Sequence, residues 1–133
     1  MNTDTTPIEI GSELTPRVQK VTRAHLSDFR DGFGGSTAHA DPSARPLQYG
    51  ARTMYPFYAM LSERFPRAFA RGGKVEGKFL AAVTLDDVIT CHCRAAERRE
   101  VDGQQMLMFE TWAVNQNGEK VLVGKASVNE GAQ

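Results

Sequence analysis

The sequence predicts an α+β domain in which an antiparallel sheet curls around one hydrophobic helix. Three observations support this fold class. One strongly apolar helix is expected from about Met54 to Phe65. Everything after Gly73 reads as strand, and two hairpin signals, Asp102-Gly103 and Asn117-Gly118, divide that region. A curled sheet around a single helix would bury the apolar surfaces of both.

Length and charge exclude several classes of protein. The chain has 133 residues, which suits a single domain over 1–133. Sixteen basic residues balance sixteen acidic ones, so no net field would recruit nucleic acid or an anionic membrane. No apolar stretch approaches the ~18–20 residues of a membrane-spanning helix, and the polar N-terminus lacks a secretory signal. We therefore expect a cytoplasmic protein with neither nucleic-acid nor membrane partners.

The N-terminal region is expected to contribute one edge of the sheet. Residues 1–7 are polar and are expected to be disordered or frayed. Residues 8–11 are expected to form a short strand or an arm that packs on the body. Residues 14–21 alternate loosely as a strand, and Pro16 within them favours an edge position.

A short helix and a long irregular segment are expected next. Thr22 is a suitable N-cap for a helix from Arg23 to about Arg30, on which His25 is expected at the surface. Glycines after Arg30 would end this helix. The irregular segment 32–50 follows, and a long loop inside a compact domain is usually functional or disordered.

The central helix is predicted from an apolar stripe with helical spacing. The stripe consists of Met54, Phe57, Tyr58, Leu61 and Phe65. Pro56 is tolerated only in a first turn, which predicts that the helix begins near Met54. Ala59 and Met60 widen the stripe, so we expect this helix to be buried on most sides.

Four strands are expected after the central helix. Their predicted bounds are Lys74–Val83, Val88–Val101, Gln104–Asn115 and Glu119–Val128. The third strand has two apolar faces: Leu107, Phe109 and Ala113 on one, and Met106, Met108, Trp112 and Val114 on the other. Such a strand is covered on both sides or lies at a subunit interface. An exposed sheet edge is commonly covered by dimerisation, which favours a homodimer.

The Cys91-His92-Cys93 triplet invites a metal hypothesis that its spacing does not support. A structural zinc site needs four ligands, and the chain has no second cysteine pair. On a strand, the two cysteines point to one face and His92 points to the other. We therefore expect two buried core thiols and no metal site.

Several motifs, taken together, resemble the MaoC-like branch of the hot-dog fold, the (R)-specific enoyl-thioester hydratases and dehydratases. The matching features span nearly the whole chain. They are the early Ile10-Gly11 followed by a strand, the Thr22-x-x-x-Leu26-x-x-Phe29 helix, His39-Ala-Asp41-Pro42-x-Ala44, Pro46-Leu47-x-Tyr49-Gly50, Gly77-Lys78-Phe79, the Thr84-Leu85-Asp86-Asp87 turn and Val114-Asn115-Gln116-Asn117-Gly118. The resemblance implies a hot-dog domain with one helix inside a curled sheet. It also implies addition of water across the double bond of a 2-enoyl thioester, or the reverse reaction.

The resemblance assigns His39 as the catalytic acid/base but leaves the second catalytic position altered. In the family, an Asp five residues before the His shares the water, whereas that position is Gly34 here. Ser36 stands at the position of the family's Asn, and Tyr49 replaces the His of a His-Gly turn. Asp31 or Ser36 would have to replace the missing acid. Asp41 is expected to close its turn. The alternative to a catalytic role for His39 is a structural role, in which this loop histidine forms a hydrogen bond with the backbone.

The resemblance also implies an acyl pocket near the start of the hot-dog helix. Backbone N–H groups at that helix start would polarise the thioester carbonyl. The expected substrate-binding residues are Phe33, Gly34, Gly35, Tyr49, Gly50, Arg52, Thr53 and Tyr55. Arg52 would meet an anionic carrier or a carboxylate, or would be an exposed charge. No cofactor or metal is implied.

Three functions remain open from the sequence. The first is a hydratase or dehydratase of an acyl-thioester or polyketide-like substrate, with His39 as acid/base. The second is a repurposed pocket that isomerises or cyclises a biosynthetic intermediate. The third is a non-catalytic ligand-binding module, or the degenerate subunit of a hetero-dimer whose paralogue carries the Asp-His pair.

Overall fold

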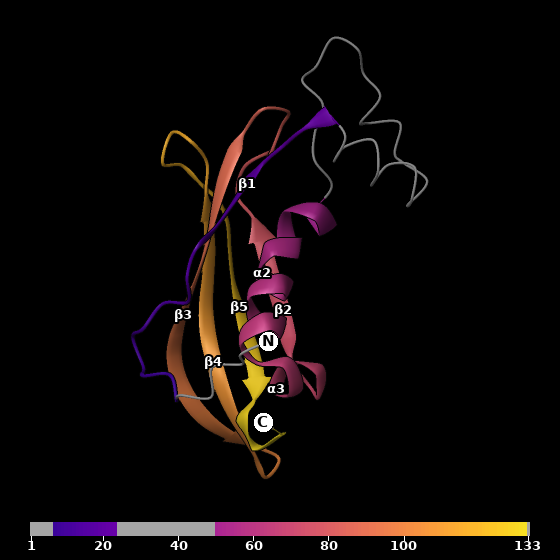
Figure 1. Ribbon diagram of the computed structural model, residues 1–133. Helices are drawn as coiled ribbons and strands as arrows, with labels where there is room; N and C mark the ends of the chain where they lie inside the picture. Colours follow the sequence, from indigo (N-terminus) through magenta and orange to yellow (C-terminus); the bar gives the residue numbers. More distant parts are fainter. Residues whose placement is uncertain (1–6, 24–49, 133) are drawn as a thin grey trace.

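The computed structural model describes residues 7–23 and 50–132, which form one antiparallel sheet with a helix against it (Figure 1). The elements in chain order are β1 (Arg17–Lys20), α2 (Gly50–Arg64), α3 (Pro66–Ala70), β2 (Lys74–Phe79), β3 (Val88–Val101), β4 (Gln104–Val114), β5 (Lys120–Asn129) and the 3-10 turn η2 (Glu130–Ala132). The sheet order is β1-β3-β4-β5-β2, and every pairing is antiparallel. Strands β1 and β2 are therefore its two edges.

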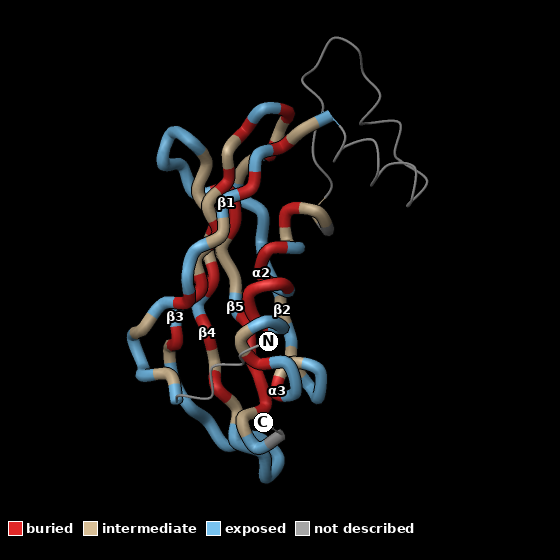
Figure 2. Tube along the Cα trace, in the orientation of Figure 1, coloured by how far each residue is buried: buried red, intermediate tan, exposed pale blue. Residues whose placement is uncertain are grey.

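The core lies between α2 and the inner face of the sheet. Phe57 and Leu61 on α2 have no exposed surface, and they belong to one apolar cluster with Leu107 and Phe109 of β4. The rings of Phe65 and Phe109 lie 5.7 Å apart between centroids. Figure 2 shows the buried positions following the helix and the central strands. The predicted α+β arrangement, a sheet against one hydrophobic helix, is confirmed.

Strands β3 and β4 form a long hairpin whose turn agrees with the sequence prediction. Strand β3 has the predicted bounds, and β4 ends one residue before its predicted end. Asp102 and Gly103 both have positive φ, 51° and 78°, which suits a two-residue hairpin turn. On β4, Leu107, Phe109 and Ala113 are buried and Met106, Met108, Trp112 and Val114 are half-buried, as the two-faced pattern predicts.

Strand β2 is shorter than predicted, and β5 departs from simple alternation. Strand β2 ends at Phe79, before the predicted Val83, because the chain turns away to form the Thr84–Asp87 turn. In that turn the Asp87 carboxylate accepts the N–H of Thr84 at 2.8 Å, which matches the turn prediction. Strand β5 has a register irregularity opposite Ala113 and Val114, so neighbouring Val121 and Leu122 are both buried.

The predicted start of the central helix is wrong. Helix α2 begins at Gly50, four residues before Met54, and Pro56 lies inside it. A proline there leaves the carbonyl of Arg52 without its helical N–H donor. The side-chain amide of Gln19, on β1, donates to that carbonyl at 3.4 Å. A contact with another element thus compensates the proline, which a local rule does not anticipate.

The helix is also less enclosed than predicted. Tyr58, expected in the buried stripe, is 43% exposed, and Tyr55 is 52% exposed. The Tyr58 ring packs edge-on against Phe69 beside α3, with centroids 6.0 Å apart. Helix α3 itself was not predicted, because its five residues are too few for a periodic pattern. The prediction of burial on most sides therefore fails on the face that carries the two tyrosines.

The N-terminal segment is an arm followed by an edge strand. Residues 8–11 form no strand; Gly11 donates its N–H to the Ala95 carbonyl at 2.8 Å, and Ile8 packs against the core. The strand expected over 14–21 is reduced to β1, with a bridge between Glu13 and Arg94 before it. Its predicted edge position is confirmed. The helix predicted from Arg23 to about Arg30 and the long loop predicted over 32–50 lie almost wholly within 24–49, outside the described residues. Gly50, the last residue of the predicted loop, is instead the first residue of α2.

Candidate functional site

The start of α2 is shaped by a close contact with the end of β2. A Cβ atom on Gly50 would lie 3.0 Å from Cε2 of Phe79 and 3.2 Å from its Cζ. Glycine therefore allows the aromatic ring to lie directly against the first turn of the helix. Figure 1 shows β2 running alongside α2, so the end of this strand helps to position the helix start.

Four of the predicted site residues are described, and all four lie on the first two turns of α2: Gly50, Arg52, Thr53 and Tyr55. The guanidinium carbon of Arg52 lies 5.4 Å from the centroid of the Tyr55 ring, so these two side chains meet. Thr53 has no exposed surface and contributes to the core side of the helix. The other predicted site residues lie outside the described residues: Asp31, Phe33, Gly34, Gly35, Ser36, His39 and Tyr49.

A cavity of about 300 Å³ lies between β1 and the first two turns of α2. Its lining consists of Arg17, Val18, Gln19, Lys20, Arg52, Tyr55 and Pro56. Three of these side chains are cationic and none is a carboxylate. Sequence reasoning named Arg52 and Tyr55 but missed Gln19 and Lys20. Their position depends on the pairing of β1 with β3, which leaves no local signal in the sequence.

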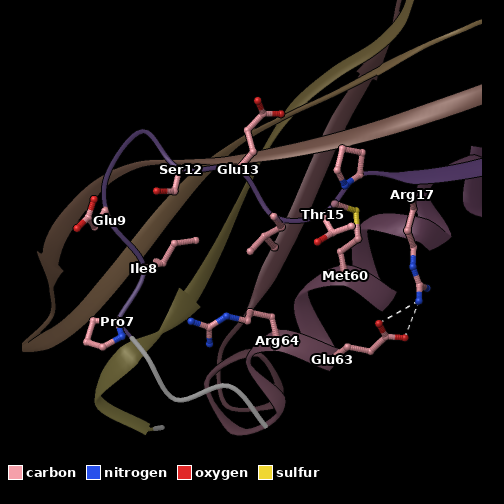
Figure 3. Close-up of a pocket in the computed structure, with 12 residues that line it drawn as sticks. Pro7, Ile8, Glu9, Ser12, Glu13, Thr15, Arg17, Met60, Glu63 and Arg64 are labelled. Atoms are coloured by element: carbon pink, nitrogen blue, oxygen red, sulfur yellow. Dashed lines mark hydrogen bonds and ion pairs between the residues drawn. The ribbon is translucent and has the colours of Figure 1, made fainter. Parts of the chain in front are cut away.

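A larger cavity, of about 710 Å³, lies between the N-terminal arm and the last turns of α2 (Figure 3). Leu14 and Met60 supply apolar lining, whereas acids and bases are mixed around them. The ion pair between Arg17 and Glu63, at 2.8 Å, borders this cavity. Because Met60 and Glu63 follow Gly50 by more than two helical turns, this cavity lies toward the other end of α2.

The Cys91-His92-Cys93 triplet is arranged as predicted. Both thiols are buried in the core, and burial raises the pKa of each from 9.0 to about 12. His92 lies on the opposite face, where its ring stacks on Trp112 with centroids 5.0 Å apart. Its Nδ1 atom lies 3.3 Å from a carboxylate oxygen of Glu13. Within residues 7–23 and 50–132, no group of three or more metal-ligating side chains comes together.

Comparison with solved structures identifies the fold. No protein-family model matches the chain, and no curated protein sequence matches it. The (R)-hydratase from A. caviae involved in PHA biosynthesis is similar with a TM-score of 0.74 and 17% identity, over 94% of this chain and 98% of that one. The chain has the hot-dog fold. The fold implied by the sequence resemblance is therefore confirmed.

Two further solved structures are similar to this chain. The MaoC-like dehydratase from Rhodospirillum rubrum has a TM-score of 0.68 and 16% identity, over 91% of each chain. The C-terminally truncated HadBC (3R-hydroxyacyl-ACP dehydratase) complex from Mycobacterium tuberculosis has a TM-score of 0.67 and 15% identity, over 90% of this chain and 95% of that one.

Among the described helices, none is long and apolar enough to cross a membrane.

Proposed function

We propose that this hot-dog protein is a hydratase or dehydratase of an acyl thioester, with His39 as its acid/base. The observation that carries the proposal is the shared fold over nearly the full length of both this chain and an (R)-hydratase. The sequence adds His39 in a segment that resembles the family motif and leads into Gly50, where α2 begins. One fold hosts many chemistries, so the residues at the site must be tested directly.

The proposed chemistry needs one proton-transfer group and one oxyanion stabiliser. His39 would accept a proton from water as the water oxygen adds to C3 of a 2-enoyl thioester. The displaced electron pair moves onto the thioester oxygen as an enolate, and C2 then takes up the proton that His39 received, which returns His39 to its starting state. The positive end of the α2 dipole would stabilise the negative oxygen. Gly34 occupies the position of the family's Asp and has no carboxylate, so Asp31 or Ser36 would hold the water instead.

The acyl pocket is proposed around the start of α2. Gly50 admits the Phe79 ring against the first turn, which supplies an apolar wall. Arg52, which is half-buried, and Tyr55, which is 52% exposed, follow along the first turns of the helix. The proposed lining also includes residues 33–35, Thr53 and Tyr49 from the sequence interpretation. A thioester placed there would bring its carbonyl to the end of the helix dipole.

The first experiment is hydration of a short trans-2-enoyl-CoA, followed by loss of the enoyl-thioester absorbance. His39→Ala should lower the rate by about 10²–10⁴-fold, because a positioned acid/base contributes on that order. His25→Ala is the matched control and should leave the rate unchanged. Gly34→Asp should raise it by supplying the absent carboxylate. Turnover of the unaltered chain no faster than His39→Ala would refute the hydratase proposal and direct the search to isomerisation or cyclisation substrates.

A second candidate is the degenerate subunit of a hetero-dimer, which the glycine at position 34 favours. The similar HadBC dehydratase structure is a complex, and this likeness supports testing whether the present chain also works with a second chain. In this case, the chain alone would be inactive and would become active on addition of a paralogue carrying the Asp-His pair. Light scattering of the purified chain would show whether it forms the expected homodimer, in which an exposed sheet edge would be covered.

A further inference from the structure

The face of the sheet that points away from α2, called here the outer face, carries an apolar stripe along β4. Met106, Met108, Trp112 and Val114 alternate with the core residues of this strand and are half-buried. On β5, Val123 lies opposite Trp112 and is also half-buried. Figure 1 shows α2 and α3 together on the other side of the sheet, so neither helix covers this stripe. The solvated face of an antiparallel sheet is normally polar, so an apolar stripe there indicates a surface that is covered.

A row of charged side chains crosses the outer face from one edge of the sheet to the other. Arg94 on β3 lies opposite Glu110 on β4, and Glu110 lies opposite Lys125 on β5. Glu76 on β2 continues the row beyond Lys125, and Glu13 precedes it through its bridge to Arg94. All five residues are exposed, and Figure 3 shows the Glu13 side chain directed away from α2. Their signs therefore alternate across the sheet, beginning and ending with a negative charge.

This charged row is only partly neutralised within one chain. Arg94 forms an ion pair with Glu110, and Glu13 contacts the ring of His92. No described side chain forms an ion pair with Lys125 or Glu76. The part of the row on β5 and β2 therefore has both signs of charge available to a second molecule.

We propose that the outer face docks on the outer face of a second copy of this chain, about a two-fold axis that runs between β4 and β5. In such a pair β4 lies over β5 of the other copy, and β3 lies over its β2. Glu110 then faces Lys125 of the partner subunit, and Arg94 faces Glu76 of the partner subunit. Each contact occurs twice by symmetry, and every charge on these four strands of the row meets its opposite.

The alternation of sign favours this register over its neighbours. Moving the axis onto β4, a shift of half a strand spacing or ~2.4 Å, would place Glu110 on Glu110 of the partner subunit. Arg94 would then face Lys125 of the partner subunit, and like charges at an interface oppose association.

A second register, with the axis between β3 and β4, is less complementary beside the charged row. It would place Glu97 over Met108 of the partner subunit, because these two residues lie opposite each other in the sheet. With the axis between β4 and β5, Glu97 faces Lys74 of the partner subunit, and Trp112 faces Val123 of the partner subunit. The proposed register thus pairs a charge with a charge and an apolar side chain with an apolar one.

The outer face is large enough for a stable pair. Five strands ~4.8 Å apart and the ~37 Å length of β4 give a face of about 700 Å². A standard interface covers about 800 Å² of each partner. Sheets packed face to face lie ~10 Å apart, so side chains as long as Trp112 and Met108 meet between them. The apolar stripe would supply affinity, and the charged row would set the register.

Charge reversals at the central contact test the proposal by sedimentation velocity. Glu110→Lys brings cations together across the interface and Lys125→Glu brings anions together, so each should raise the dissociation constant at least about tenfold. Each variant alone should then have half the mass of the unaltered protein. An equimolar mixture of the two should recover the full mass, because the introduced lysines of one chain face the introduced glutamates of the other. Arg67→Glu, an exposed reversal on α3, is the matched control and should keep the full mass.

The fluorescence of Trp112 gives a second measurement, on the unaltered protein, because the chain has one tryptophan. Its emission should shift to shorter wavelength as the protein concentration rises through the dissociation constant, since packing removes water from the indole ring. The mixture of variants should show this shift, and neither variant should show it alone over the same range. Far-UV circular dichroism should be the same for all of these proteins, because positions 110 and 125 are exposed.

The face pairing leaves both edge strands free, so it is separable from a dimer that covers a sheet edge, and it does not depend on the proposed hydration. An unaltered protein that stays monomeric at every concentration, with constant Trp112 emission, would overturn the proposal. A mass that neither variant changes would assign the association to another surface and would also overturn it. A mixture that remains at half the mass would refute the contact between positions 110 and 125.

Discussion

Gly124→Ala should loosen the edge strand that supports the start of α2. Gly124 on β5 lies directly opposite Gly77 on β2. A Cβ atom added at Gly124 would lie 2.1 Å from the carbonyl oxygen of Glu76 and 2.8 Å from the Cα of Gly77. Both of these atoms belong to the backbone of β2, so no side-chain rotation relieves the contact. The two strands must separate or bend.

The size of the effect follows from this contact. The added methyl is about 1.3 Å closer to the Glu76 oxygen than the 3.4 Å at which ordinary contact begins. Overpacking of a well-packed site costs about 1–3 kcal/mol, and a clash with backbone belongs at the upper end of that range. We expect the free energy of unfolding to fall by ~3 kcal/mol. The amides of β2 should lose hydrogen-exchange protection first, because β2 is paired only to β5 among the described strands.

Urea denaturation followed by circular dichroism measures this change, with Gly131→Ala as the control. At Gly131 the nearest atom to an added Cβ is the side-chain oxygen of Asn129, at 3.3 Å, which can move. The control should change stability by about 0.5 kcal/mol or less. If Gly124→Ala costs as little as its control, the close approach of β2 and β5 is not as the structure describes it. Since the Phe79 ring at the end of β2 lies against Gly50, a real loss should also lower the proposed hydration activity.

Three further predictions test other parts of the fold. Burial raises the pKa of the Cys91 and Cys93 thiols from 9.0 to about 12. At a given pH below 9, the fraction of thiolate is therefore about a thousandfold lower in the native protein than in the protein unfolded by urea. A disulfide reagent should label the native protein correspondingly more slowly. Because the native pKa is raised, the contribution of these two thiols to stability is fully present below about pH 9 and is lost as the pH rises toward about 12. The urea midpoint should therefore fall over that range. A constant midpoint would contradict the burial of the thiols. Phe57→Ala should cost about 3–5 kcal/mol by denaturation, whereas exposed Tyr55→Ala should cost less than ~1. Arg98 donates a hydrogen bond to the Ile8 carbonyl at 2.6 Å and forms an ion pair with Glu130. Arg98→Ala should therefore release the N-terminal arm and speed its proteolysis at sites before Glu13. An unchanged cleavage rate would count against this contact.

The parts of the fold that the sequence predicts well depend on local chemistry. Asp102-Gly103 can adopt the left-handed backbone of a two-residue turn, so the hairpin and the bounds of β3 could be found from residues near the turn. The period of two along a strand likewise places Cys91 and Cys93 inward and His92 outward. In both cases the decisive interaction lies within a few residues of the signal.

The parts that the sequence predicts poorly depend on contacts between distant segments. Pro56 indicates a helix start by local rules, but Gln19 on β1 donates to the carbonyl that the proline leaves, and the helix extends back to Gly50. Tyr58 fits the apolar stripe, yet its place beside Phe69 leaves it exposed. At the candidate site, Arg52 and Tyr55 could be named from their positions on one helix. Lys20 could not, because sheet pairing brings it there.

In the proposed hydratase, the glycine at position 34 would separate substrate binding from proton transfer. The absence of a catalytic carboxylate there would lower the rate of proton transfer but would leave the start of α2 and the Phe79 ring beside it in place. Substrate binding should therefore outlast catalysis in this chain. If a 2-enoyl thioester binds and Gly34→Asp raises its hydration, the protein has a weakened active site. If the thioester binds and the added carboxylate changes nothing, binding itself is the retained property, which favours a subunit that works beside a catalytic partner.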